Sequence, residues 1–173
     1  MGFATSSHTY STLISNLMID ASSNTKYWYF IRLMGRDPSH LTLECALSTK
    51  PNYTIISEEI VHKGWDLEDI VEDIVRVVVK RFETGRNFGC ILIPEGLPTF
   101  LPSISRIKNE LDEIKAKDEK GLDKMSAWAR EKFGKLPEFI RKELFCRDDC
   151  NELAVSQIES EKLLAYLVSE RLK

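Results

Sequence analysis

Several segments of the chain repeat their hydrophobic positions with a helical period. The clearest follows Asp66, which is expected to cap a helix ending near Gly85, and its apolar stripe comprises Leu67, Ile70, Val71, Ile74, Val77 and Val78. Further helices are predicted around residues 10–18, with Ser7 or Thr9 as the cap, and over 39–48 and 104–114. A final helix is predicted after a capping box of Ser156 and Glu159, with a buried face of Leu164, Leu167, Val168 and Leu172.

Three β-rich runs alternate with these helices, at residues 27–34, 53–56 and 89–93. Consecutive parallel strands need long connections, and these connections are right-handed in nearly all folds. The alternation therefore predicts an α/β protein, a partial Rossmann-like parallel sheet with covering helices.

The composition changes after about residue 115. The segment KAKDEKGLDK is highly charged, and the sequence beyond it has helical spacing but no β-rich run. We therefore predict two parts, an α/β portion over residues 1–116 and a helical insertion lobe over 117–173.

Net charge and cysteine spacing narrow the function classes. A formal charge of −3 gives little attraction to nucleic acid or to anionic membranes, and no apolar run approaches the ~18 residues that span a bilayer. The four cysteines match neither a disulfide framework nor a zinc site, which favours reduced thiols in the cytoplasm.

Ligands of open parallel sheets collect at the carboxyl ends of the strands. After the first predicted strand, Gly35 allows close backbone approach and Arg36 offers donors suited to oxyanions, which together indicate a phosphosugar contact. The alternative is a strand-end turn with a surface charge. After the third strand, Glu95 stands between Pro94 and a glycine, where it could hold sugar hydroxyls or be a solvated turn residue.

Other polar residues are given structural interpretations. Glu58 and Glu59 are expected to be polar caps of a strand end, because adjacent strand residues point to opposite faces and cannot converge on one substrate. His8, His40 and His62 show no ligand spacing, and His40 is expected to begin a helix. No metal site is predicted.

The motifs of phosphoryl transfer are missing from the chain. No Gly-rich loop of the GxxxxGK[ST] or GxGxxG kind opens a helix, and no strand ends in closely spaced aspartates that could hold magnesium. The sequence therefore does not encode a complete phosphotransferase.

The chain nevertheless resembles the phosphofructokinase family, and most closely its long pyrophosphate-dependent branch. The resemblance runs along the chain in KYWYFIRLMGRDPSHLTLECAL, PNYTIISEE, NFGCILIPEGL, LPEFIRKEL and AVSQIESEKLLAYL. It implies that Met34, Gly35 and Arg36 form the loop around fructose 6-phosphate and that Glu95 is the sugar-binding glutamate. It further implies that Lys26 and Tyr27 reach the sugar phosphate in a neighbouring subunit, as part of a homo-oligomer or of a larger phosphofructokinase.

The departures from the family imply an incomplete enzyme. The diphosphate-binding Gly-Gly-Asp loop and the catalytic Thr-Ile-Asp-Gly-Asp strand are expected upstream, and residues 2–6 read GFATS where the family usually has GFDTA. We therefore expect a fragment whose parent, with Mg²⁺ held elsewhere, phosphorylates fructose 6-phosphate with pyrophosphate in glycolysis, and which is inactive alone. The alternatives are an ATP-dependent parent, a non-catalytic regulatory subunit, and a standalone interaction module.

Overall fold

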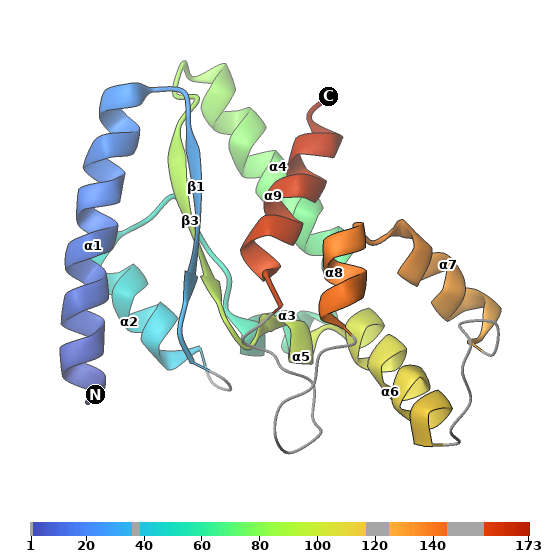
Figure 1. Cartoon of the computed structure of the whole chain (residues 1–173). Coiled ribbons are helices and arrows are strands. Elements are labelled where there is room, and N and C mark those ends of the chain that lie inside the picture. The colour runs from blue at the N-terminus through green and yellow to red at the C-terminus, as the bar shows by residue number, and fades with distance from the viewer. Residues whose placement is uncertain (1, 36–38, 117–124, 145–157) are drawn as a thin grey trace.

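The computed structural model describes residues 2–35, 39–116, 125–144 and 158–173, with the backbone alone for 112–116. Its centre is a three-stranded parallel sheet of order β1-β3-β2, formed by β1 (Trp28–Leu33), β2 (Tyr53–Thr54) and β3 (Gly89–Pro94). The last strand in sequence is therefore the central one (Figure 1). The predicted α/β class and parallel sheet are confirmed.

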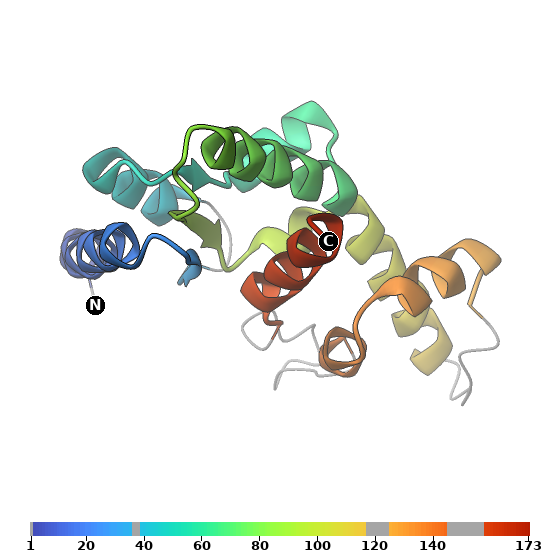
Figure 2. The same cartoon turned by 90° about the horizontal axis from the view of Figure 1, so that it is seen from above.

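Helices cover both faces of this sheet. The helices in the described ranges are α1 (Phe3–Asn24), α2 (His40–Thr49), α3 (Ser57–Lys63), α4 (Leu67–Glu83), α5 (Leu97–Phe100), α6 (Pro102–Ala116), α7 (Ala127–Lys135), α8 (Glu138–Glu143) and α9 (Ser160–Arg171). In Figures 1 and 2, α1 and α2 lie on one side of the sheet and α4 and α9 on the other. None of the helices in the described ranges is long and apolar enough to cross a membrane.

The alternation of side chains along β3 explains this layering. Cys90 and Leu92 pack with Ile14 of α1 and Cys45 of α2, whereas Ile91 and Ile93 face the cluster formed with α4 and α9. All six residues of β3 are buried. A strand with apolar side chains on both faces suits the centre of a parallel sheet covered by helices.

The helix α4 agrees with its sequence signals. The Asp66 side chain accepts from the Leu67 amide at 2.8 Å, and Asp69 reciprocates by accepting from the Asp66 amide at 2.8 Å, which forms a capping box. The buried residues are Leu67, Ile70, Val71, Ile74 and Val78. Five of the six predicted stripe residues are therefore buried.

The predicted start of the first helix was wrong. The helix α1 begins at Phe3, and neither Ser7 nor Thr9 caps it. Their hydroxyls instead donate to carbonyls one turn back, Ser7 to Ala4 and Thr9 to Thr5, as hydroxyls inside a helix can.

Two further expectations need correction. Glu58 and Glu59 lie in α3 rather than on a strand end, because β2 is only two residues long and the helix begins at Ser57. At the other end of the chain, α9 buries Leu164 and Val168, but Leu172 is 46% exposed. The predicted cap Ser156 lies outside the described residues.

The hydrophobic core extends across the predicted boundary at residue 116. One cluster includes Ile91 and Ile74 of the α/β part together with Phe133, Ile140 and Leu164 of the helical part. Arg32 of β1 also forms an ion pair with Glu161 of α9 at 3.2 Å. The division into two parts stays a prediction.

Candidate functional site

The carboxyl ends of β1 and β3 bring two predicted site residues into direct contact. Leu33 is paired with Pro94 in the sheet, and the Glu95 amide donates to the Leu33 carbonyl at 2.9 Å. Two residues after Leu33, beyond the end of β1, the Gly35 amide donates to Glu95 Oε2 at 2.9 Å. Residues 60 positions apart in the sequence thus form one polar edge of the sheet.

Gly35 has a backbone conformation that explains its residue type. Its φ is 140°, in the range that residues with a Cβ rarely adopt. The preceding Met34 is 66% exposed, so it lies on the surface of this edge rather than in the core. The backbone turns away from β1 here and presents its amide to Glu95.

Glu95 is held from both sides. It follows the buried strand β3 directly and precedes α5, whose first turn is closed by the Thr99 hydroxyl donating to the Gly96 carbonyl at 2.8 Å. The side chain is half-buried, and an ionised carboxylate is an acceptor only. One oxygen takes the Gly35 amide, and no described residue donates to the other, so Oε1 can accept from a ligand hydroxyl.

The remaining predicted residues do not all join this edge. Arg36 lies outside the described residues. Lys26 and Tyr27 are exposed and precede β1, where the Gly89 amide donates to the Tyr27 carbonyl at 3.2 Å. The six residues of β1, which span about 20 Å at ~3.3 Å per residue, lie between them and Gly35. Within one chain, they therefore lie at the opposite end of the sheet.

A second feature of the edge was not anticipated from the sequence. The helices α2 and α3 begin side by side and cap each other: Glu58 Oε1 accepts from the Ser39 amide at 2.8 Å, and Ser39 Oγ accepts from the Ser57 amide at 2.9 Å. Ser39 makes no cap bond within its own helix. Ser39 and Glu58 are both recognisable in the sequence as polar residues at the end of an element. Their pairing across 19 positions could not be predicted from it.

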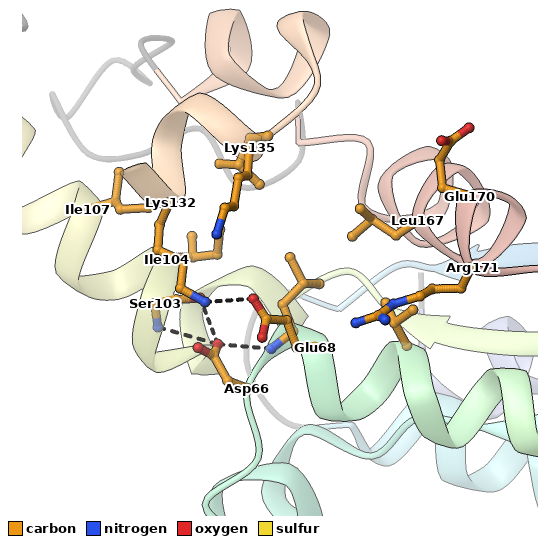
Figure 3. A pocket seen from close by; sticks show the side chains of 13 residues that line it. Asp66, Glu68, Ser103, Ile104, Ile107, Lys132, Lys135, Leu167, Glu170 and Arg171 are labelled. Atoms are coloured by element: carbon orange, nitrogen blue, oxygen red, sulfur yellow. Dashed lines mark hydrogen bonds and ion pairs between the residues drawn. The ribbon is translucent and has the colours of Figure 1, made fainter. Parts of the chain in front are cut away.

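A hollow among other helices is a separate feature of the described residues. This helical pocket, about 250 Å³, lies among α4, α6, α7 and α9, and its lining includes Leu67, Val71, Ile104, Leu136, Leu167 and Lys132. Figure 3 shows Lys132 and Glu68 pointing toward each other at its rim, where they pair at 2.6 Å. None of the predicted site residues lines it.

The helical pocket suits a phosphosugar poorly. Its surface is mostly apolar, and its charged groups already have partners: Asp66 accepts from the Ser103 hydroxyl at 2.6 Å, and Lys135 pairs with Glu131 at 2.7 Å. A sugar phosphate needs several available donors and acceptors. The sheet edge is therefore the better candidate site.

Cys45 and Cys90 belong to the packed core, and His40 lies at the start of a helix. Cys45 and Cys90 are buried free thiols, and Cys146 and Cys150 lie outside the described residues. Burial raises the pKa of Cys90 to about 12. His40 begins α2 as predicted. Among the described residues, no three His, Cys, Asp or Glu side chains gather where they could hold a metal ion.

Comparisons with known proteins point to one family. Residues 1–127 match the phosphofructokinase family. The whole chain is similar to two subunits from Arabidopsis thaliana, pyrophosphate–fructose 6-phosphate 1-phosphotransferase subunit beta 2 (43% identity over 99% of the chain) and subunit alpha 2 (42% over 97%).

A bacterial relative also matches nearly the whole chain. The pyrophosphate–fructose 6-phosphate 1-phosphotransferase of Porphyromonas gingivalis is 40% identical over 99% of this chain. Only 34% of that relative is covered, and 31% and 28% of the two plant subunits. The chain thus spans about a third of the length of the curated relatives it matches.

Proposed function

This chain belongs to the phosphofructokinase family, and we propose that it forms part of the fructose 6-phosphate site of a pyrophosphate-dependent phosphotransferase. The parent reaction would transfer a phosphoryl group to the 1-hydroxyl of fructose 6-phosphate. In this proposal the described residues bind and orient the sugar, and the transfer chemistry belongs to other parts of the enzyme.

The observation that carries the proposal is the hydrogen bond between Gly35 and Glu95. It holds the ends of two neighbouring parallel strands together at the place where α/β proteins bind ligands. No described residue donates to the other carboxylate oxygen of Glu95, which would accept from a sugar hydroxyl, and Gly35 would leave room for close approach because it lacks a Cβ. A carboxylate anchored in this way is preorganised, which lowers the cost of ordering it on binding.

Each proposed residue has a distinct physical role. Glu95 would accept from sugar hydroxyls, and the guanidinium of Arg36, next to Gly35 in the sequence, would pair with an oxyanion through charge-assisted bonds. Exposed Met34 would contact the apolar face of the sugar ring. Fixing the orientation of the sugar in this way raises the rate of an in-line attack without activating the nucleophile.

Magnesium would neutralise the diphosphate in such an enzyme. The described residues do not fit a magnesium site, because no three suitable side chains gather among them. We therefore assign no step of the transfer to a metal ion held by these residues.

The positions of Lys26 and Tyr27 support an oligomer in which subunits share sites. They lie at the far end of β1 from Glu95, so neither can serve the sugar edge of its own chain. We propose that they contact the phosphate bound by a neighbouring subunit. The partner would be a second copy or another subunit of a larger phosphofructokinase.

The names of the relatives support pyrophosphate as the donor, since all three relatives compared above carry it in their names. An ATP-dependent parent is the alternative, because the described residues include no donor site. The buried free thiols Cys45 and Cys90 fit a reducing compartment, and we propose the cytoplasm.

The proposal is tested by calorimetric titration of the chain with fructose 6-phosphate. The wild-type chain should bind, and Glu95→Ala should weaken binding more than about tenfold, equivalent to ~1.4 kcal/mol. Glu95→Gln should fall between them, because its amide oxygen can still accept from the Gly35 amide but one acceptor position becomes a donor.

The matched control is Glu138→Ala, which removes an exposed carboxylate that pairs with Lys142 on α8, far from the sheet edge in the sequence. It should bind as the wild type does. If Glu95→Ala binds fructose 6-phosphate as tightly as Glu138→Ala, the proposed role of the edge is wrong. Inorganic phosphate, titrated in parallel, separates recognition of the sugar from simple anion binding.

A further inference from the structure

The helical pocket is lined by none of the residues proposed to bind the sugar. We propose that it binds a small organic anion with an apolar tail, of the chemical class of a medium-chain carboxylate. This inference goes beyond the proposed function and does not depend on it. Three features of the pocket carry it: an apolar floor, two cations that reach over that floor, and carboxylates that are engaged elsewhere.

The floor of the pocket is apolar and comes from four helices. Its buried or half-buried side chains are Leu67 and Val71 of α4, Ile104 and Ile107 of α6, Leu136 at the end of α7, and Leu167 of α9. The volume of about 250 Å³ holds roughly eight non-hydrogen atoms, at ~30 Å³ for a group the size of water. An apolar tail of that length would leave water and gain dispersion contacts with side chains on several sides.

Two cations from different helices reach over this floor. Figure 3 shows Lys135 of α7 and Arg171 of α9 extending over the hollow from opposite sides, whereas Glu170 points away from it. Lys135 pairs with Glu131 at 2.7 Å, and both side chains are more than half exposed. Arg171 lies 3.8 Å from Glu72, again with both side chains more than half exposed. Exposed pairs of this kind contribute little, so a bound carboxylate can compete for both cations.

The carboxylates beside the floor have partners that hold them more firmly. Asp66 is the N-cap of α4 and accepts from the Ser103 hydroxyl at 2.6 Å. Glu68 pairs with Lys132 at 2.6 Å, and Lys132 is only 28% exposed, so solvent screens this pair less. The charges best able to change partners are therefore the two cations over the hollow. The rim favours an anionic head group over a cationic one.

An anion with an apolar tail fits this arrangement better than a sugar phosphate does. Small-molecule pockets combine a largely apolar lining with a few polar groups that fix the orientation of the ligand. A sugar would bring its hydroxyls against Val71 and Ile104, whose side chains offer no hydrogen-bond partner. A carboxylate head would instead stay at the solvent-facing rim, between Lys135 and Arg171, and avoid the cost of burying a charge.

Calorimetric titration of the 173-residue chain with octanoate tests the proposal. Octanol and octylamine carry the same tail and serve as the uncharged and the cationic probe. Octanoate should bind saturably at one site, and on the order of threefold to tenfold more tightly than either, because its head gains two exposed charge pairs. Hexanoate, which has two fewer CH₂ groups, should bind about tenfold more weakly than octanoate.

A double variant tests the two cations. Lys135→Gln combined with Arg171→Gln removes both charges but keeps long side chains at the rim. It should lower the affinity for octanoate to about that for octanol and leave octanol binding unchanged. The matched control is Lys142→Gln, which removes a lysine from another exposed pair, with Glu138 at 2.8 Å on α8, outside the pocket. This control should bind octanoate as the wild type does.

Nuclear magnetic resonance of the ¹⁵N-labelled chain locates the tail. Octanoate should shift the amide signals of Leu136 and Leu167, which line the pocket, and leave that of Gly35 at the sheet edge unchanged. Shifts confined to the sheet edge would overturn the assignment of the site. So would the absence of saturable octanoate binding, equal binding of octanoate and octanol by the wild type, or an unchanged affinity for octanoate in the double variant.

The result is separable from that of the sugar site. Glu95→Ala should bind octanoate as the wild type does, and excess fructose 6-phosphate should not displace octanoate. Displacement would show that the two ligands share one site, which contradicts the proposal. A chain that binds octanoate but not fructose 6-phosphate would refute the proposed function alone, and the reverse result would refute this inference alone.

Discussion

Gly35 and Glu95 show how single residues were identified from the sequence and then placed by the fold. Each follows an apolar run that forms a strand, and the carboxyl ends of adjacent parallel strands meet at one edge. Their hydrogen bond of 2.9 Å follows from that topology together with the positive φ of Gly35. Lys26 and Tyr27 precede β1 instead of following it, so the same rule separates them from this edge.

At the same scale, Cys90 is predicted to be chemically inert in the native protein. It is buried in the central strand, and burial raises its pKa to about 12. A raised pKa leaves little reactive thiolate, roughly one thiol in ten thousand at pH 8. Site-resolved mass spectrometry after brief alkylation should find Cys90 unmodified in the native chain and modified in urea. Rapid labelling of native Cys90 would show that β3 is not the covered centre of the sheet.

Among the helices and strands, those whose own sequence carries a clear apolar pattern or capping residue were predicted well. The fully apolar β3 and the capped, striped α4 needed no tertiary information. The reciprocal caps of α2 and α3 could not be predicted, because Ser39 is a suitable cap for its own helix and nothing local indicates that it serves another. The helix α3 was missed because Tyr53–Ile56 suits a longer strand, although the strand ends at Thr54.

The start of α4 carries a prediction about helix capping. Asp66 caps this helix and also accepts from the Ser103 hydroxyl of α6 at 2.6 Å. Asp66→Ala should therefore lower the free energy of unfolding by about 1–3 kcal/mol, from the lost cap and the lost contact with α6. Urea denaturation followed by circular dichroism measures this change.

The control for this prediction is Glu72→Ala on the exposed face of the same helix. Glu72 lies 3.8 Å from Arg171, and both side chains are more than half exposed. Such a pair contributes about 0–1 kcal/mol. Equal destabilisation by the two variants would contradict the assigned role of Asp66.

For the whole molecule, the shared core bears on how the chain unfolds. The sequence predicted two parts divided at residue 116 from a change in composition, yet one apolar cluster contains residues from both sides. Composition reports what a segment contains and not what it packs against. A continuous core favours one cooperative transition.

Tryptophan fluorescence can test this cooperativity directly. Trp28 and Trp65 lie before the predicted boundary and Trp128 after it, and all three pack against the same cluster. Two variants, Trp128→Phe and the double variant Trp28→Phe with Trp65→Phe, let each side report alone. We expect coincident urea midpoints. Clearly separate midpoints would establish two independent parts.

The central claim concerns the edge where β1 and β3 end, and a crystal structure of this chain with fructose 6-phosphate tests it most directly. We predict that Gly35 and Glu95 lie together there and that a sugar hydroxyl is within about 3 Å of the Glu95 carboxylate. A sugar bound in the helical pocket, or Gly35 and Glu95 turned apart with no ligand between them, would contradict the account.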